Sequence, residues 1–306
     1  MYYLGLNIIL VNYIMEKIRK YIADKRATLS DSSITTYTSI LKNLYKKVFG
    51  DEDYDLSKFD NSDKVITFLK DVAPNKRKTI LSALVIITDK KAYRDLMAED
   101  VKAYNKEISK QIKTDEQEAS WVGTQQVREL YEALKRNADL LYKKKTHTIS
   151  DLQEIQNYVL LSVLGGIYVP PRRSKDFCDF KIKQIDKSKD NFLDKNKMIF
   201  NSFKTAKTYG TQDLEIPTQL RNILKKWISI NPTDYLFFDS NMNPLSSVKL
   251  NQRLNKVFDK KVSVNQLRHT YLTDKFGETI NTKNAVANTM EDMGSSSGML
   301  DTYVKK

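Results

Sequence analysis

A polar segment divides this chain of 306 residues into two parts of different character. Residues 113–120 read Lys-Thr-Asp-Glu-Gln-Glu-Ala-Ser, a run that contains no large apolar side chain. Such a run cannot contribute to a hydrophobic core, and each flanking part is long enough to form its own. We therefore predict a domain over 15–112, a linker over 113–120 and a second domain over 121–306, with 1–14 as an N-terminal extension.

The part before the linker is predicted to be entirely helical. Its apolar residues recur at intervals of three and four, as in Ile34, Tyr37 and Leu41, and it carries no strand signal. Ser32 or Ser33 is suited to cap the first helix, and Gly50 is suited to end it. The predicted helices run from this cap to 49 and over 62–70, 76–88 and 92–113.

The part after the linker is predicted to combine helices with a small antiparallel sheet. Thr124 is expected to cap one helix, and Ser150 or Asp151 to cap a long apolar helix that ends at Gly165-Gly166. The segment 197–203 alternates imperfectly and 213–216 follows a turn, which indicates two strands. Further helices are predicted from 218 and over 247–258, 264–276 and 282–290. The fold class is therefore mostly α (α+β): a helical domain followed by a larger helical domain with a small sheet.

Composition narrows the classes of partner. The formal net charge of +13 favours a polyanion, and nucleic acid is the first candidate. One cysteine, Cys178, excludes an internal disulfide and indicates a reducing, intracellular compartment, and we predict that it is buried. His147 and His269 are the only histidines, so no zinc site of His and Cys is expected. The apolar run 1–14 is shorter than the roughly 20 residues that span a bilayer and lacks the features of a signal peptide, so neither a membrane role nor secretion is expected.

The C-terminal forty residues carry the most specific motif. Residues 265–271 read Asn-Gln-Leu-Arg-His-Thr-Tyr, and Met293-Gly294-Ser295 is followed by a late tyrosine, Tyr303. This layout resembles that of the tyrosine recombinase (phage-type integrase) family. The resemblance covers the chain from about Ser32 onward. It implies a helical core-binding domain and a catalytic domain that clamp a DNA duplex, with Arg268 as a phosphate ligand and Tyr303 as the nucleophile.

A second arginine motif lies at 170–180, which reads Pro-Pro-Arg-Arg-Ser-Lys-Asp-Phe-Cys-Asp-Phe. The family has an arginine here, a carboxylate three positions later and apolar residues beyond it. Arg173 fits this pattern with Asp176, whereas Arg172 would place Lys175 at the carboxylate position. We therefore expect Arg173 to bind phosphate because its planar fork grips two oxygens, and keep Arg172 as the alternate.

The resemblance also implies a lysine on a β-hairpin that protonates the leaving oxygen. The matching segment, 203–210, reads Phe-Lys-Thr-Ala-Lys-Thr-Tyr-Gly. Lys207 immediately precedes the expected turn and is the first choice, and Lys204 is the alternate.

Two positions depart from the family pattern. Asn265 stands three residues before Arg268, and therefore on the same helix face, where most of the family has histidine. Ser295 stands where the family has histidine or tryptophan. Both can still donate a hydrogen bond to phosphate, but an amide cannot transfer a proton near neutral pH. His269 is an alternate for that task, although a packed or supporting role is favoured for it.

The resemblance implies a site-specific DNA recombinase or integrase that cleaves and rejoins double-stranded DNA through a covalent 3′-phosphotyrosyl intermediate. It implies a homotetramer on DNA, and no cofactor, metal or small-molecule substrate is expected. The Pro-Pro-Arg-Arg and Lys-Thr-Ala-Lys segments further resemble those of virophage and giant-virus mobile-element integrases. Two alternatives remain: a DNA-binding relative with weak or lost cleavage, and a monomeric type IB topoisomerase-like enzyme.

Overall fold

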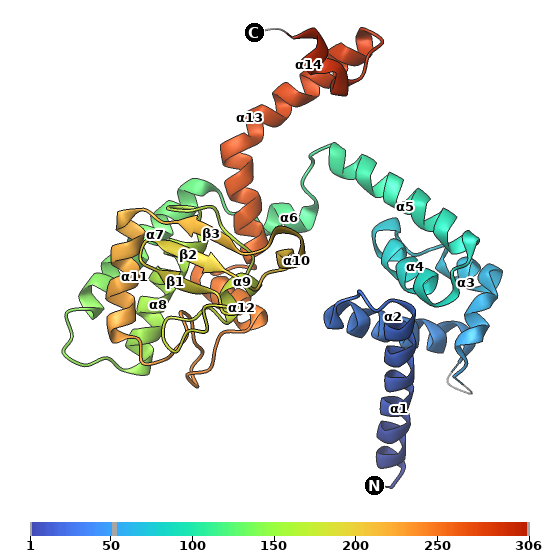
Figure 1. Cartoon of the computed structure of the whole chain (residues 1–306), viewed down its shortest axis with the longest axis horizontal. Coiled ribbons are helices and arrows are strands. Elements are labelled where there is room, and N and C mark those ends of the chain that lie inside the picture. The colour runs from blue at the N-terminus through green and yellow to red at the C-terminus, as the bar shows by residue number, and fades with distance from the viewer. Residues whose placement is uncertain (1, 51–53, 305–306) are drawn as a thin grey trace. The chain divides into compact units, whose positions relative to one another are not determined.

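The structure is a computed structural model, and it describes residues 2–50 and 54–304. The chain forms two compact units, which divide between Ile112 and Lys113 (Figure 1). No helix among the described residues is long and apolar enough to cross a membrane.

The first unit is helical throughout its described part. Ser30 caps α2 by accepting a hydrogen bond from the Ser33 backbone N–H, and Gly50 follows the last helical residue with a φ of 89°. Pro74 occupies the first turn of α4, where its missing N–H costs nothing, so this helix begins before the predicted position 76. The elements are α1 (Tyr2–Lys25), α2 (Asp31–Phe49), η1 (Leu56–Asp60), α3 (Ser62–Leu69), α4 (Pro74–Thr88) and α5 (Lys91–Ser109).

Aromatic side chains and one ion pair hold the first unit together. Tyr93 is fully buried and donates a hydrogen bond of 2.6 Å to the carbonyl of Phe59, which is also buried. Arg77 donates two hydrogen bonds, of 2.9 and 2.7 Å, to the buried carboxylate of Asp100. This bidentate pair joins α4 to α5. Residues 2–14 of the predicted extension lie within α1, whose backbone shows no break at Met15, and residue 1 lies outside the described residues.

The segment predicted to be a linker contains a helix, α6 (Asp115–Ser120). Thr114 accepts a hydrogen bond from the Gln117 backbone, and the Gln117 side chain accepts one from the Thr114 backbone, which completes a capping box. The absence of apolar residues was therefore informative about burial but not about backbone conformation.

The second unit surrounds a three-stranded antiparallel sheet with helices. Its elements are α7 (Thr124–Leu141), α8 (Ile149–Leu164), α9 (Lys175–Cys178), β1 (Phe192–Asp194), β2 (Lys197–Phe200), α10 (Ala206–Tyr209), β3 (Gln212–Glu215), α11 (Thr218–Ile230), α12 (Ser247–Phe258), α13 (Val264–Asp292), η2 (Ser297–Met299) and α14 (Leu300–Tyr303). This arrangement confirms the predicted fold class. Thr148 caps α8, and Asp151, which we expected as a cap, accepts a hydrogen bond from the Thr148 backbone N–H as the third helical residue.

The strand β2 is shorter than the segment predicted to form it. The sheet order is β1-β2-β3, and Phe200 is paired with Gln212 at one end of the β2–β3 ladder. The predicted strand over 197–203 ends at Phe200, and β1 was not predicted. Residues 201–211, which we call the lysine loop, connect β2 to β3.

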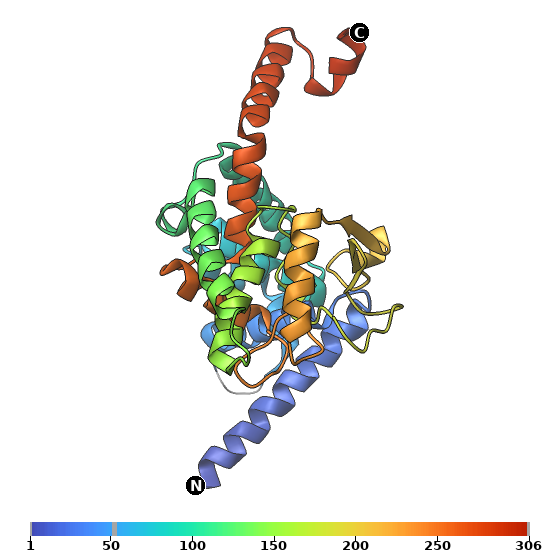
Figure 2. The same ribbon diagram turned by 90° about the vertical axis from the view of Figure 1, so that its left-hand side faces the viewer.

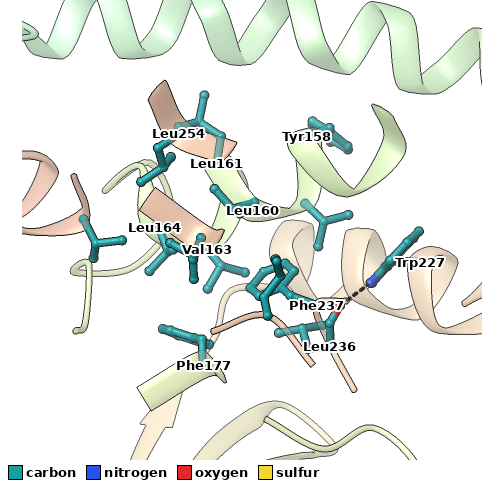
Figure 3. Packing of buried hydrophobic residues seen from close by; sticks show 14 of the residues in the cluster. Tyr158, Leu160, Leu161, Val163, Leu164, Phe177, Trp227, Leu236, Phe237 and Leu254 are labelled. Atoms are coloured by element: carbon teal, nitrogen blue, oxygen red, sulfur yellow. Dashed lines mark hydrogen bonds between the residues drawn. The ribbon is translucent and has the colours of Figure 1, made fainter. Parts of the chain in front are cut away.

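The core of the second unit includes buried residues of α8, α11 and the strand β2. Consecutive residues of α8 from Val159 to Leu164 are buried, which agrees with the long apolar helix predicted here. Figure 3 shows Leu160 and Val163 beside Phe237, and Leu161 beside Leu254. The buried indole of Trp227 donates a hydrogen bond of 2.8 Å to the carbonyl of Leu236 (Figure 3). This core fixes the loop that follows α8 and the short helix α9.

The C-terminal helix differs from prediction. We expected a break between 276 and 282, but α13 is one helix of 29 residues. Gly277 does not interrupt it, because glycine costs only about 1 kcal/mol in a helix and the segment contains no proline. At 1.5 Å per residue, a helix of this length extends about 43 Å. In both views α13 leaves the packed part of the second unit and carries α14 beyond its outer end (Figures 1 and 2).

Candidate active site

The first arginine motif lies in the segment between α8 and α9. Pro171 is buried, Arg172 and Arg173 are half-buried, and Asp176 in the following turn is only 2% exposed. The Arg173 carbonyl accepts a hydrogen bond of 3.0 Å from the Asp176 backbone N–H. The two arginine side chains are thereby presented from a tight turn that is anchored on the core.

Arg172 is engaged with its own domain. Its Nε donates a hydrogen bond of 2.9 Å to Asp176 Oδ2, and its Nη1 donates one of 3.0 Å to Gln212 Oε1. Its guanidinium carbon lies 3.9 Å from the ring centroid of Phe200, which is fully buried. Both hydrogen bonds and stacking therefore hold Arg172.

Arg173 differs from Arg172 in its contacts. Within the described part of the chain its guanidinium makes no hydrogen bond or ion pair, although it lies close enough to Asp176 and Arg268 to influence the pKa of both. The contacts in the structure therefore distinguish the two neighbouring arginines. Arg173, the residue we predicted as the phosphate ligand, is the one whose guanidinium is free in the described chain.

Asp176 is the common neighbour of three guanidinium groups. Burial raises the pKa of its carboxyl group, and the positive charges of Arg172, Arg173 and Arg268 oppose that rise. Its second oxygen, Oδ1, is buried and has no hydrogen-bond partner among the described residues. Three cations surround one anion, so the local balance is positive and suits an anionic ligand.

The base of α13 is firmly anchored. Ser263 caps the helix by accepting a hydrogen bond from the Gln266 backbone N–H, and Leu267 is 1% exposed. The hydroxyl of Thr270 donates a hydrogen bond of 2.6 Å to the carbonyl of Val122, a buried residue that precedes α7. These contacts fix the helix on both sides of Arg268.

Arg268 faces Asn265 on the same side of α13, as the spacing predicted. Arg268 Nη1 donates a hydrogen bond of 3.3 Å to Asn265 Oδ1, and Asn265 Nδ2 lies 3.3 Å from His269 Nε2. Burial and the neighbouring positive charge of Arg173 lower the pKa of Arg268. His269 is exposed and not packed, so Asn265 is in contact with both a guanidinium and an imidazole.

The candidate lysines lie in the lysine loop. Lys204 and Lys207 are both exposed, and Lys207 lies in the helical turn α10, not before a β-turn as predicted. Gly210, with a φ of 67°, ends that turn and returns the chain to β3. Neither lysine makes an ion pair within the described residues, so both are available to a ligand.

The structure does not bring Tyr303 and Ser295 to the arginines. Both residues follow the far end of α13, whereas Arg268 lies near its start. The Tyr303 hydroxyl, on a side chain that is 56% exposed, lies 3.5 Å from Ser295 Oγ. Arg173, Asp176 and Arg268 thus form one cluster, and Ser295 and Tyr303 form a separate pair.

Sequence reasoning missed the contribution of Gln212 and Asn191. The Asn191 amide, in a residue 6% exposed, donates hydrogen bonds to the carbonyls of Asp176 and Ser202, of 2.9 and 2.7 Å. Isolated polar residues carry no spacing signal, so only the structure reveals this connection. No group of three or more His, Cys, Asp or Glu side chains within 2–50 and 54–304 is placed to hold a metal ion.

No protein-family model and no curated protein matches the chain. The chain is similar to recombinases and integrases of known structure. The match to XerA recombinase has a TM-score of 0.36 and 13% identity and covers 86% of this chain and 83% of that one. The match to lambda integrase (residues 75–356) bound to DNA has a TM-score of 0.48 and 14% identity and covers 86% of each chain. A lambda integrase tetramer bound to a Holliday junction matches with a TM-score of 0.45 and 15% identity, over 85% of this chain and 71% of that one.

Proposed function

We propose that the protein is a site-specific DNA recombinase that cleaves and rejoins DNA through a 3′-phosphotyrosyl intermediate. The observation that carries this proposal is the convergence of Arg173 and Arg268 near the buried Asp176, where the guanidinium of Arg173 has no hydrogen-bond partner among the described residues. Fixed guanidinium groups in a site of positive charge are what a phosphodiester requires when negative charge develops on its non-bridging oxygens.

The proposed reaction consists of two transesterifications. The Tyr303 oxygen attacks phosphorus, a phosphotyrosyl bond forms, and the bond from phosphorus to the 5′-oxygen breaks. Lys207 gives a proton to the departing oxygen, and the phenolic proton passes to solvent. A 5′-hydroxyl then attacks the phosphotyrosine and releases Tyr303. Because the phosphotyrosyl bond conserves the energy of the phosphodiester, rejoining needs no nucleotide hydrolysis.

The proposal requires that Tyr303 approach the arginines of its own chain. The outer part of α13 is suited to break, because it contains Gly277 together with the β-branched residues Thr279 and Ile280, which are poor helix formers. After Thr270, Met290 is the only buried residue of α13 in the described chain, so little packing supports the outer turns. We propose that the helix bends near Gly277 when DNA is bound and returns the Ser295–Tyr303 pair to Arg268.

Double-stranded DNA is the proposed partner, and a homotetramer is the proposed assembly. The net charge of +13 fits a polyanion, and exchange of strands between two duplexes requires four cleavage events and hence four active sites. We further propose that the substrate DNA lies in repeats that flank the gene, as the resemblance to mobile-element integrases suggests.

The decisive experiment uses nicked DNA that carries the inverted repeats flanking the gene, so that a cleaved end diffuses away and the covalent adduct is trapped. The wild-type protein should give an adduct that resists denaturation. Tyr303→Phe should give none while binding the same DNA, and Tyr104→Phe, which alters an exposed tyrosine of the first unit, should behave as wild type. An adduct with Tyr303→Phe would exclude Tyr303 as the nucleophile.

A second candidate is a DNA-binding relative that has lost cleavage. The distance of Tyr303 from the arginines in this structure, together with Asn265 and Ser295 in place of histidines, favours it. Wild-type protein that binds the repeats tightly but never forms an adduct would establish this candidate.

A further inference from the structure

The guanidinium group of Arg172 lies where the lysine loop leaves and rejoins the sheet. Phe200 is the last residue of β2, Gln212 is the first of β3, and the two are register partners. Arg172 stacks on Phe200 at 3.9 Å and donates to the Gln212 side chain at 3.0 Å, so it contacts both stems of the loop. Its ring contact with Phe203, at 5.2 Å, extends this hold into the loop itself.

The other edge of the same guanidinium is bound to the arginine cluster. Arg172 Nε donates to Asp176 Oδ2, and the Arg172 side chain is 20% exposed against 2% for Asp176. Asn191 makes a parallel connection, because its amide joins the carbonyl of Asp176 to both the carbonyl and the N–H of Ser202. Two buried or half-buried side chains therefore join the segment that carries Arg173 to the loop that carries Lys207.

This arrangement gives the two adjacent arginines different tasks. Two of the three guanidinium nitrogens of Arg172 donate to its own domain, and its flat face covers an aromatic ring. A phosphate could use Arg172 fully only by displacing the buried Asp176 or the half-buried Gln212, which would leave that polar group without its partner. Arg173, one residue later, has its nitrogens unoccupied in the described chain.

We propose that Arg172 is a positioning residue that holds the lysine loop in register with the phosphate-binding arginines. The inference rests on the proposed function, since it assigns to Arg172 the placement of the lysine that protonates the leaving 5′-oxygen. Lysine cannot replace it, because an ammonium group has neither the planar fork nor the stacking face.

The test compares ordinary DNA with DNA in which sulfur replaces the bridging 5′-oxygen at the cleaved bond. With sulfur, attack by Tyr303 forms the same phosphotyrosyl bond and breaks the bond from phosphorus to sulfur. The sulfur leaves as a thiolate without receiving a proton, because thiols ionise at a pKa of about 8.5, far below that of alcohols. A defect in delivering the proton is therefore repaired by this substrate, whereas a defect in binding phosphate is not.

We expect Arg172→Lys and Gln212→Ala to slow cleavage of ordinary DNA by up to about 100-fold, the effect of misplacing a catalytic group by about 1 Å. Both should regain most of the wild-type rate on the sulfur substrate, as should Lys207→Ala. Arg173→Ala should be slow on both substrates. Gln219→Ala, which changes an exposed glutamine of α11, is the matched control for Gln212→Ala and should match wild type on both.

Gln212→Ala keeps the charge of Arg172 and its pairing with Asp176, so it carries the test alone if Arg172→Lys fails to fold. Wild-type cleavage of ordinary DNA by this variant would overturn the inference. A loss that sulfur does not repair would also overturn it and would make Arg172 a phosphate ligand. Hydrogen exchange of amides 203–211, measured without DNA, distinguishes failure of this inference from failure of the proposed function. If Arg172 holds the lysine loop, exchange should be faster in Arg172→Lys and Gln212→Ala but not in Arg173→Ala. This result is expected whether or not the wild-type protein cleaves DNA.

Discussion

The arginine cluster and the C-terminal arm, which comprises residues 272–304, are built on opposite principles. In the cluster, Asp176 is buried, and Arg268 extends from turns of α13 that are fixed by the buried Leu267 and by the hydrogen bond from Thr270 to Val122. In the arm, the large apolar side chains of Leu272 and Phe276 are 50% and 43% exposed. The phosphate-binding half of the proposed site is therefore preorganised, and the half that carries the nucleophile is not.

The contrast occurs within a single helix. The first turns of α13 are fixed by Leu267 and by the hydrogen bond from Thr270, whereas the turns after Tyr271 are supported by little more than their own backbone bonds. If the proposed function holds, a site divided in this way would bind DNA before it reacts with it. Cleavage would then be limited by how readily the arm changes shape.

The largest expected effect comes from mixing two inactive variants, which tests whether the arm and the arginine cluster of one chain act together. A mixture of Tyr303→Phe and Arg173→Ala should form no adduct on nicked DNA, because each active site is proposed to take its tyrosine and its arginines from one chain. Adduct formation in the mixture, measured on denaturing gels, would mean that the arm reaches a second copy without bending back.

Core and arm should also differ in stability. Phe177→Ala, at a side chain 1% exposed, should lower the free energy of unfolding by about 3–5 kcal/mol. Phe276→Ala should change it by less than about 0.5 kcal/mol, because the side chain has little packing to lose. Equal effects in chemical denaturation would show that the arm is packed in solution.

Introducing a histidine beside Arg268 should increase the cleavage rate. Asn265→His should raise the cleavage rate about tenfold, since general acid–base catalysis typically contributes 10²- to 10⁴-fold and the site is otherwise imperfect. The variant should also gain a limb near pH 6.5 in its pH–rate profile. The corresponding change at the other departure, Ser295→His, should act in the same direction. An unchanged rate with both, together with inactivity of a folded His269→Ala, would assign proton transfer to His269.

The smallest expected effect concerns the bend in α13. Gly277→Ala fits without a clash, since no described atom beyond the local helix backbone lies within 4 Å of the added Cβ, and it stabilises the straight helix by about 1 kcal/mol. Cleavage should slow about fivefold, the factor that corresponds to this free energy. Ala285→Gly, an exposed position of the same helix, changes helix stability by the same amount in the opposite direction and should not slow cleavage. A faster reaction with Gly277→Ala would show that the straight helix is the reactive form.

The sequence predicted those features that are repeated along the chain or placed at fixed spacing. Helical periodicity located α2, α3 and α12 closely, and the spacing of Asn265 and Arg268 placed them correctly on one face. It did not reveal that α13 is continuous, because a glycine among weak helix formers is compatible with either a break or an uninterrupted ladder. The helix propensities of single residues differ by about 1 kcal/mol or less, which is too little to decide between these from the sequence.

The sequence also carried too little information about the two arginines. The pattern favoured Arg173 by its distance from Asp176, but it did not indicate which contacts Arg172 makes. Those contacts are with Phe200 and Gln212, which come from strands some thirty to forty residues away along the chain. Likewise, the lysine loop was correctly placed between two strands, but the helical turn α10 within it was not predicted.

The hydrogen bond from Thr270 to the Val122 carbonyl gives the connecting segment a mechanical meaning. Trp121 and Val122 directly follow α6, and the carbonyl of Trp121 also accepts a hydrogen bond, of 2.5 Å, from Lys260, which precedes α13. Tension applied to residues 113–120 is therefore transmitted to the base of the helix that presents Arg268. We propose that a load on this segment would first displace the helical turn that carries Arg268, the arginine proposed to bind phosphate.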